Sequence, residues 1–121
     1  MPILDVEVVV RPGEALPLPL AKALADAMGE VFGSRPGGLW LRLRELPAAR
    51  YAENGGEGEA PCPVFVTVRE ARVPERAVLE PRMKDIAGRV AALTGRPREN
   101  VHVIQEPPLA GRIAFGGEFV P

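Results

Sequence analysis

The chain carries an internal repeat, because its second half matches its first half without a gap at an offset of 62 residues. The identical pairs are Val6/Val68, Pro12/Pro74, Ala15/Ala77, Pro19/Pro81, Lys22/Lys84, Ala25/Ala87, Gly33/Gly95, Ala48/Ala110, Arg50/Arg112, Ala52/Ala114 and Gly55/Gly117. They fall at expected helix starts, helix ends and hairpin glycines. Self-similarity at a fixed period is typical of a duplicated structural unit. The 121 residues are therefore interpreted as one domain of two pseudo-repeats, about 1–60 and 61–121.

Each half has the hydrophobic pattern of a β-α-β unit. In the first half the expected elements are a strand at 3–10, a helix with apolar residues from Leu16 to Phe32, and a strand at 39–44. In the second half they are a strand at 64–68, a helix opened by Pro74, and a strand at 101–104. The second helix has an apolar stripe of Leu79, Met83, Ile86, Val90 and Leu93. Both helices are expected to end before a glycine, Gly33 or Gly95.

Prolines and glycines delimit these elements. The pairs Pro12/Pro74 and Pro19/Pro81 are interpreted as equivalent helix starts, because proline is tolerated in the first turn of a helix. Segment 52–63 predicts a hairpin tip followed by a linker, and segment 113–115, before two glycines, predicts a closing hairpin.

The predicted fold class is α/β (α+β), with a four-stranded sheet, two helices and a short C-terminal hairpin. A parallel pair of strands requires a right-handed crossover, so both helices are expected on one face of the sheet. The other face needs cover as well, which predicts an oligomer.

Charge and composition exclude several classes of function. Fifteen basic and sixteen acidic residues give a net charge of −1, which argues against binding a nucleic acid or a membrane through bulk charge. No apolar run reaches the roughly 18 residues of a transmembrane helix, and no signal peptide is expected. The single Cys62 fits a reducing compartment, so a cytoplasmic protein is predicted. His102 has no Cys or His at ligand spacing, and no cofactor-binding motif is visible, so neither a metal nor a cofactor is predicted.

The N-terminus is the sharpest candidate for chemistry. A methionine before a small residue is normally removed, which would make Pro2 the first residue of the mature chain. A free prolyl nitrogen is a secondary amine that acts as a base once desolvation lowers the pKa of its conjugate acid towards neutrality. The alternative is that Pro2 only begins a strand, and retention of Met1 would turn the amine into an amide.

Arginines supply the candidate anion sites. Arg69 and Arg72 are three residues apart at the end of a predicted strand and could converge on one carboxylate with bidentate geometry. Arg42 and Arg44 share one face of a strand and could form a second clamp. For both pairs the alternative is a solvated part of the sheet.

Three further residues could form the apolar walls of a substrate pocket. Tyr51, Ile113 and Phe115 are these candidates, and they could equally be ordinary core residues.

Several of these features together resemble the tautomerase superfamily. The resemblance rests on Met1-Pro2-Ile3 before a strand, on the two β-α-β units, and on the ending from Gly111 to Glu118. The stretch 100–118 is similar to the end of 4-oxalocrotonate tautomerase. The resemblance implies the tautomerase/MIF-like fold, a homotrimer of fused protomers, no cofactor, and an amino-terminal proline that acts as acid or base.

The paired Arg69 and Arg72 resemble the arginines that hold the substrate carboxylate in cis-3-chloroacrylic acid dehalogenase, a fused member of the superfamily. The chain departs from that relative where Met28 replaces a histidine and Ile104 replaces a tyrosine. A water-activating glutamate is replaced by Ala114 or Phe115. Hydrolytic dehalogenation needs a group that polarises water, whereas tautomerisation needs only a base and a group that stabilises charge. These differences favour proton transfer over hydration.

A second departure concerns the residue that would bind the second carboxylate of a dicarboxylate substrate. Trp40 and His102 are repeat equivalents and stand where 4-oxalocrotonate tautomerase places a substrate-binding arginine. His102 remains a candidate substrate contact, but neither residue reliably replaces the arginine's charge.

The predicted function is that of a cofactor-independent tautomerase, an isomerase acting on a small 2-keto or enol carboxylate. Pro2 would transfer the proton, and Arg69 and Arg72 would hold the carboxylate. Two alternatives stay open: a dehalogenase, hydratase or decarboxylase on the same residues, and a non-catalytic trimeric binding module.

Overall fold

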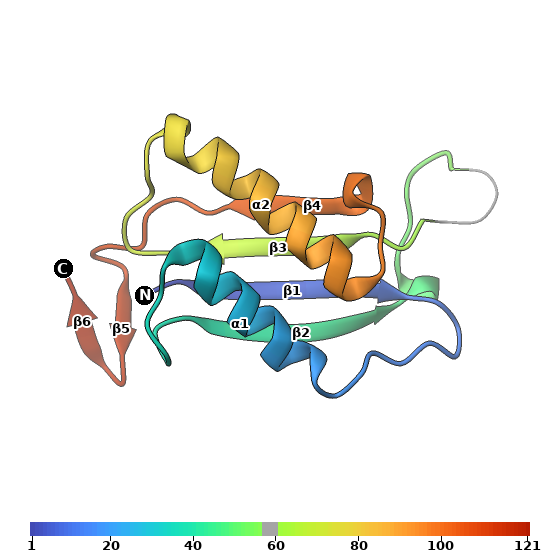
Figure 1. Cartoon of the computed structure of the whole chain (residues 1–121), viewed down its shortest axis with the longest axis horizontal. Coiled ribbons are helices and arrows are strands. Elements are labelled where there is room, and N and C mark those ends of the chain that lie inside the picture. The colour runs from blue at the N-terminus through green and yellow to red at the C-terminus, as the bar shows by residue number, and fades with distance from the viewer. Residues whose placement is uncertain (57–60) are drawn as a thin grey trace.

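The computed structural model describes residues 1–56 and 61–121 and shows the predicted α/β fold (Figure 1). The main strands are β1 (Ile3–Val10), β2 (Trp40–Pro47), β3 (Val64–Arg69) and β4 (Val101–Gln105). The helices are α1 (Leu20–Phe32) and α2 (Arg76–Thr94), with short 3-10 turns η1 (Ala48–Arg50) and η2 (Arg98–Asn100). A C-terminal hairpin pairs β5 (Ile113–Phe115) with β6 (Glu118–Val120).

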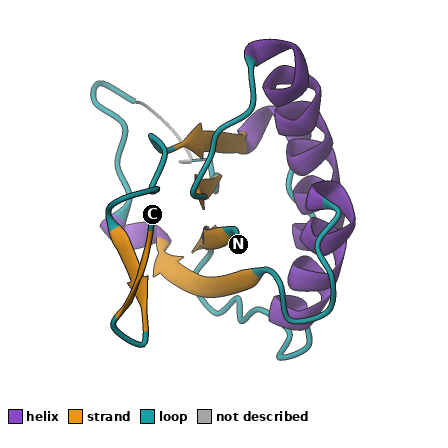
Figure 2. Ribbon diagram, turned by 90° about the vertical axis from the view of Figure 1, so that its left-hand side faces the viewer, coloured by secondary structure: helices purple, strands orange, loops and turns teal. Residues whose placement is uncertain are grey.

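The four main strands form one sheet in the order β2-β1-β3-β4. Both helices cover the same face of this sheet, whereas the β5–β6 hairpin lies on the opposite side (Figure 2). Leu4, Val6 and Val8 of β1 are buried under the helices together with Leu24 and Met28. Because side chains alternate along a strand, the residues between them point to the other side.

We call that other side the open face. Its residues are Ile3, Asp5 and Glu7 on β1, Trp40, Arg42 and Arg44 on β2, Phe65, Thr67 and Arg69 on β3, and His102 and Ile104 on β4. They are half-buried or exposed.

The internal repeat is reproduced in the pairing of the strands. Each residue of β1 pairs in parallel with the residue 37 positions later in β2, as Ile3 does with Trp40. β3 pairs with β4 at the same spacing, as Val64 does with Val101. The two halves therefore have the same internal register.

The two halves meet where β1 and β3 pair antiparallel. At the middle of this pairing Asp5 stands opposite Thr67, and these two positions are also equivalent under the 62-residue offset. A local two-fold axis therefore passes between Asp5 and Thr67 and relates one half of the sheet to the other.

The predicted helix ends are confirmed. Gly33 and Gly95 follow the last helical residues with φ values of 62° and 68°, in the left-handed region that glycine adopts without strain.

The helix starts differ from the prediction. The first helix begins at Leu20 instead of Leu16, because the residues before Pro17 and Pro19 are pushed away from helical geometry. The second begins at Arg76, two residues after Pro74.

The interpretation of Pro12/Pro74 and Pro19/Pro81 as equivalent helix starts is wrong, because Pro12 lies in the turn after β1 and Pro81 lies within a helix. Pro19 immediately precedes α1, whereas Pro81 lies inside α2 on its exposed side. The second helix is consequently longer, with 19 residues against 13, and the additional residues are at its N-terminal end.

The buried stripe of α2 also differs at one end. Ile86 and Val90 are buried as predicted, but Leu93 is 39% exposed. Ala91 and Thr94 are buried instead, because they lie one helical turn from the residues that face the sheet.

Segment 52–63, predicted as a hairpin tip and linker, can be assessed only in part, because residues 57–60 lie outside the described residues. The described part contains a turn in which Gly55 has a φ of 68°.

Arg96 joins several elements at the end of the sheet where β1 finishes. Its side chain is 3% exposed, and it donates to both carboxylate oxygens of Glu14 at 2.9 Å. It also donates to the backbone carbonyls of Val9 (2.8 Å), Cys62 (3.2 Å) and Thr94 (3.3 Å). The contact with Arg96 holds the pKa of the Glu14 carboxyl below its usual value, and the backbone N–H of Arg11 adds to this effect.

Arg82 has a corresponding role near the end of β3. Its Nη2 donates to both carboxylate oxygens of the buried Glu70, at 3.1 and 3.0 Å, and to Gln105 at 3.1 Å. The guanidinium lies 4.4 Å from the centre of the Phe32 ring, so it also links α2 to α1 through a cation–π contact.

Candidate functional site

Pro2 lies at the entrance to β1 and is half-buried. Its carbonyl accepts a hydrogen bond from the backbone N–H of Trp40, the first residue of β2, at 3.1 Å. Because β1 and β2 run parallel and β3 runs against them, Pro2 shares one end of the sheet with Arg69, the last residue of β3. Figure 1 shows the N-terminus at this end, beside the β5–β6 hairpin.

An aromatic contact brings the hairpin to this end of the sheet. The rings of Trp40 and Phe115 meet edge to face, with centroids 5.2 Å apart and an angle of 87° between the ring planes. Ile113 belongs to the same short strand, β5, and is half-buried. Trp40 and Phe115 therefore supply apolar surface at the end of the sheet where Pro2 lies, and Ile113 belongs to the same hairpin.

A cluster of charged side chains lies on the open face around Asp5, the third residue of β1. Arg42 donates to both oxygens of Asp5, from Nε at 2.7 Å and from Nη2 at 3.0 Å. Arg69 donates from Nη1 to Asp5 Oδ2, and Arg44 lies 3.7 Å from Oδ1. The Asp5 side chain is 15% exposed. It lies beside three arginines, two on β2 and one on β3.

The protonation of Asp5 should affect the stability of the fold at acid pH. Its contact with Arg42 lowers the pKa of the Asp5 carboxyl, burial opposes this effect, and Arg69 lowers the pKa further. A carboxyl whose pKa is lower in the folded state stabilises the fold above its unfolded pKa, and this contribution is lost as pH falls through the folded pKa.

We expect Asp5→Asn to cost about 1 kcal/mol at pH 7, since the guanidinium groups involved are partly exposed. The difference from the unaltered protein should begin to shrink below about pH 4, where the Asp5 carboxyl of the unfolded chain becomes protonated, and should vanish below the lowered pKa of the folded state. Urea denaturation at pH 7 and at pH 3 measures this. A difference that is the same at both pH values would show that Asp5 is not the group responsible.

Arg69 and Arg72 have no common partner among the described residues. Arg69 is held by Asp5, and its Nη2 is 3.9 Å from a carboxylate oxygen of Glu106. Arg72 lies in the loop after β3 and is exposed, with no ion pair or side-chain hydrogen bond to the described residues. Of the two, Arg72 has the freer guanidinium.

Two other candidates lie at the opposite end of the sheet from Pro2 within one chain. The rings of Tyr51 and Phe65 are 6.1 Å apart, and those of Phe65 and His102 are 5.6 Å apart. Phe65 is in the first half of β3 and pairs with His102, far from Arg69. The hydroxyl of Tyr51 donates to Glu53, and this contact raises the pKa of Tyr51.

This second aromatic cluster is the repeat equivalent of the Pro2 end. Tyr51 corresponds to Ile113 and His102 corresponds to Trp40 under the 62-residue offset. The position that corresponds to Pro2 is Val64, which lies inside the chain and is buried, so this end offers no free amine.

Asp5 and Glu106, the two carboxylates beside the Arg69 guanidinium, are not among the site residues predicted from the sequence. Asp5 did carry a signal, since Asp5 and Glu7 are charged residues in a largely apolar, β-branched strand, and Asp5 pairs with Arg42 of the neighbouring strand. Glu106 follows β4 in a proline-rich turn, and its sequence context gives no such indication.

The described residues contain no group of three or more His, Cys, Asp or Glu that could hold a metal ion. Within residues 1–56 and 61–121, no helix has both the length and the apolar character needed to cross a membrane.

Four surface grooves lie away from the N-terminus. They are located between α2 and β4, along the outer side of α2, at the C-terminal end of α1, and beside the turn after β1. Neither Pro2 nor Arg69 lines any of these four.

Comparison with solved structures identifies the fold. The chain is similar to Pt0534 inactivated by 2-oxo-3-pentynoate, with a TM-score of 0.76 and 16% identity over 98% of this chain and 94% of that one. It is also similar to a fused 4-OT described as a symmetric trimer, with a TM-score of 0.70 and 22% identity over 88% and 85% of the two chains.

A third similar structure is the macrophage migration inhibitory factor homologue from Prochlorococcus marinus, with a TM-score of 0.72 and 14% identity over 96% of each chain. No protein-family model matches the sequence, and no curated protein matches it. The chain therefore has the fold of the tautomerase superfamily, and at these identities the likeness establishes the fold alone.

Proposed function

We propose that the protein is a cofactor-independent tautomerase, an isomerase that moves a proton on a small 2-keto or enol carboxylate. The observation that carries this proposal is the position of Pro2. It is half-buried at the end of the sheet, between the aromatic pair of Trp40 and Phe115 and the guanidinium-bearing end of β3. Apolar surface on one side and cations on the other suit a small organic anion.

In the proposed reaction Met1 is absent and Pro2 carries a neutral secondary amine. The amine nitrogen takes the hydroxyl proton of the enol, and the electron pair of that O–H bond stays on oxygen as an enolate, forming the carbonyl only as the C=C electrons are protonated at carbon. The electrons of the C=C bond then take a proton from the prolyl ammonium at carbon, which gives the 2-keto acid and restores the neutral amine. No atom is gained or lost, so the step needs no cofactor or co-reactant.

The arginines hold the carboxylate of the substrate in this proposal. Arg72 has a freely accessible guanidinium, and Arg69 has N–H donors beyond those that contact Asp5 and Glu106. Positive charge next to the reacting carbons also stabilises the enolate that forms in the transition state. Arg42 and Arg44 also lie beside Asp5, so they share its negative charge with Arg69 and leave part of the Arg69 charge for the substrate.

The active unit is proposed to be a homotrimer. The open face carries exposed Trp40 and Ile104, which a single chain leaves without cover. Among the similar structures, fused 4-OT proteins are described as symmetric and asymmetric trimers. A trimer would supply the missing cover and would hold one Pro2 site per chain.

Covalent labelling tests the role of Pro2 directly. The reagent is 2-oxo-3-pentynoate, the compound that inactivates the similar protein Pt0534. The prolyl nitrogen is expected to add to the alkyne carbon β to the ketone. A proton then goes to the other alkyne carbon, which is bonded to the carbonyl. Intact mass spectrometry should show a chain without Met1 that gains the whole mass of one reagent, and peptide mapping should place the adduct on Pro2.

The matched control is the same protein with one extra residue before Pro2, which turns the amine into an amide. We expect it to bind no reagent and to lose the proton-transfer activity. Active protein that keeps Met1, or labelling that occurs only on Cys62, would contradict the proposal.

A further inference from the structure

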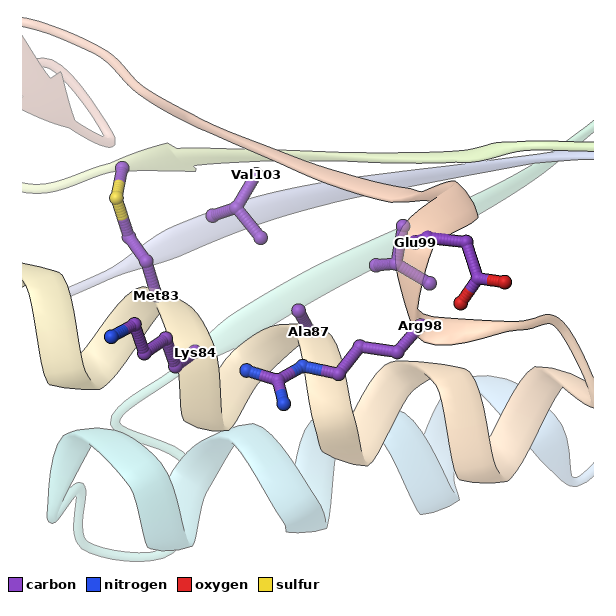
Figure 3. Close-up of a pocket in the computed structure, with 7 residues that line it drawn as sticks. Met83, Lys84, Ala87, Arg98, Glu99 and Val103 are labelled. Carbon is purple, nitrogen blue, oxygen red and sulfur yellow. The ribbon is translucent and has the colours of Figure 1, made fainter.

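A groove runs between α2 and the edge strand β4, away from Pro2 (Figure 3). Its volume is about 510 Å³, within the range of about 300–1,000 Å³ that is usual for small-molecule sites. The lining residues are Met83, Lys84 and Ala87 on α2, Arg98 and Glu99 on η2, and Val101 and Val103 on β4. The floor is apolar, because α2 leaves part of the β4 side chains uncovered.

Two cations lie on one side of this groove. Figure 3 shows the Arg98 side chain reaching past Ala87 in the direction of Lys84, while the carboxylate of Glu99 points away from both. Arg98 forms no ion pair or side-chain hydrogen bond with the described residues. An arginine extended over apolar carbon, with its donors unused, is a suitable contact for an anion.

The surrounding charges limit the charge of that anion. The Lys84 ammonium is 3.9 Å from a carboxylate oxygen of Glu80, so the positive charge of Lys84 is partly compensated. The compensation is only partial because Glu80 also lies 3.5 Å from Arg76. Arg98 is thus the one cation at the groove whose charge is not balanced by a described partner. The site is suited to a single negative charge and less to a dianion.

We propose that this groove binds a monocarboxylate with an apolar chain. Arg98 receives the carboxylate through its planar fork, and the chain lies on Met83, Val101 and Val103. The proposal is independent of the reaction assigned to Pro2, because no groove residue belongs to that site.

An NMR titration of the full chain with decanoate, kept below its micelle concentration, tests this binding. We expect saturable shifts centred on the amides of Ala87, Val101 and Val103. Arg98→Gln keeps a polar side chain but shortens it and removes its charge, and it should weaken decanoate binding about tenfold or more. The matched control is Arg35→Gln, since Arg35 also lacks a side-chain partner among the described residues but lines the groove at the end of α1. It should leave the affinity unchanged.

Two analogues separate the contribution of the head group from that of the chain. Decanol has no charge and should bind about tenfold more weakly than decanoate, whereas decyl phosphate should bind no more tightly. Equal binding of decanol, tighter binding of decyl phosphate, or an Arg98→Gln variant with unchanged affinity would each overturn the proposal. So would shifts in the groove that depend on protein concentration alone, because they would identify a second copy of the chain as the occupant.

Discussion

Replacing Pro2 by alanine should lower the rate of enol-to-keto conversion by about 10²–10⁴-fold, the usual contribution of a positioned acid or base. The pyrrolidine ring fixes the nitrogen relative to β1, whereas the primary amine of alanine rotates freely and is more strongly hydrated. The rate is measured by the loss of enol absorbance of an aryl enolpyruvate. Most of the change should appear in kcat, since the carboxylate contacts are not altered.

Two controls make the Pro2→Ala result interpretable. Intact mass must show that Met1 is absent from both proteins, because alanine is also small enough to permit its removal. Arg35→Gln, a surface change at the end of α1, should keep full activity. A Pro2→Ala protein with undiminished activity would exclude Pro2 as the base, and chloride release from 3-chloroacrylate at a comparable rate would favour a dehalogenase instead.

Replacing Arg96 by methionine should destabilise the fold by about 3 kcal/mol, the lower end of the usual loss when one partner of a buried charge pair is removed, because Glu14 is 27% exposed. Methionine fills a similar volume but leaves Glu14 and the carbonyls of Val9, Cys62 and Thr94 without their donor. The loss is a large fraction of the free energy of unfolding of an ordinary domain, which is about 5–15 kcal/mol. Urea denaturation followed by circular dichroism measures the loss.

Glu14→Gln keeps the result informative if the Arg96→Met protein does not fold. Its amide oxygen still accepts from Arg96, so the loss should be clearly smaller. Arg89→Met removes an arginine that is 37% exposed and paired with Glu30 and Asp85, and it should cost much less than Arg96→Met because exposed ion pairs contribute little. Equal losses for Arg96→Met and Arg89→Met would show that the burial of Arg96 contributes little.

The fold was predictable because the signals that specify it are local. β1 alternates and is rich in β-branched residues, and each helix ends at a glycine that adopts a left-handed conformation. The repeat then restricts the ways in which these elements combine, since two equal β-α-β units place both helices on one face. Element order, sheet order and the side of the helices follow from this.

The start of α2 was not predictable from the repeat. Equivalence with Pro19 placed Pro81 at a helix start, yet Pro81 lies within α2, with Glu75 as the residue before the helix. Pro81 is exposed, so its ring meets solvent rather than the packed sheet. A tandem repeat conserves the packed positions of its two units more strictly than the ends that lie in solvent.

The buried ion pair of Glu70 and Arg82 could have been found by comparing the halves. Their repeat equivalents are Val8 and Leu20, which are both buried in the core. Opposite charges at two positions that are apolar and buried in the other half indicate an ion pair in place of an apolar contact. An unpaired charge at either position would carry a large desolvation cost. Arg96 carries no such signal, since its equivalent, Ser34, follows a helix in the same way but is not fully buried.

The candidate site was predictable only in its parts. Pro2, Arg69, Ile113 and Phe115 belong to one end of the molecule, and the sequence identified each of them singly. Which carboxylate would hold Arg69 depends on the register between β1 and β3, and that register is fixed by tertiary packing. The same register separates Tyr51 and His102 from Pro2 within one chain.

The pairing of Asp5 with Thr67 on the two-fold axis shows what a tandem chain permits. Two identical subunits related by this axis would place the same residue opposite itself, and an aspartate there would face a second aspartate at close range. Like charges directly opposite each other on neighbouring strands are destabilising. Covalent joining of the two units breaks this symmetry, so one unit can keep an acid that gathers arginines while the other keeps a neutral hydroxyl. A tandem chain can therefore hold a polar pair of two different residues at the centre of its sheet, where two identical subunits would be restricted to a residue facing its own copy.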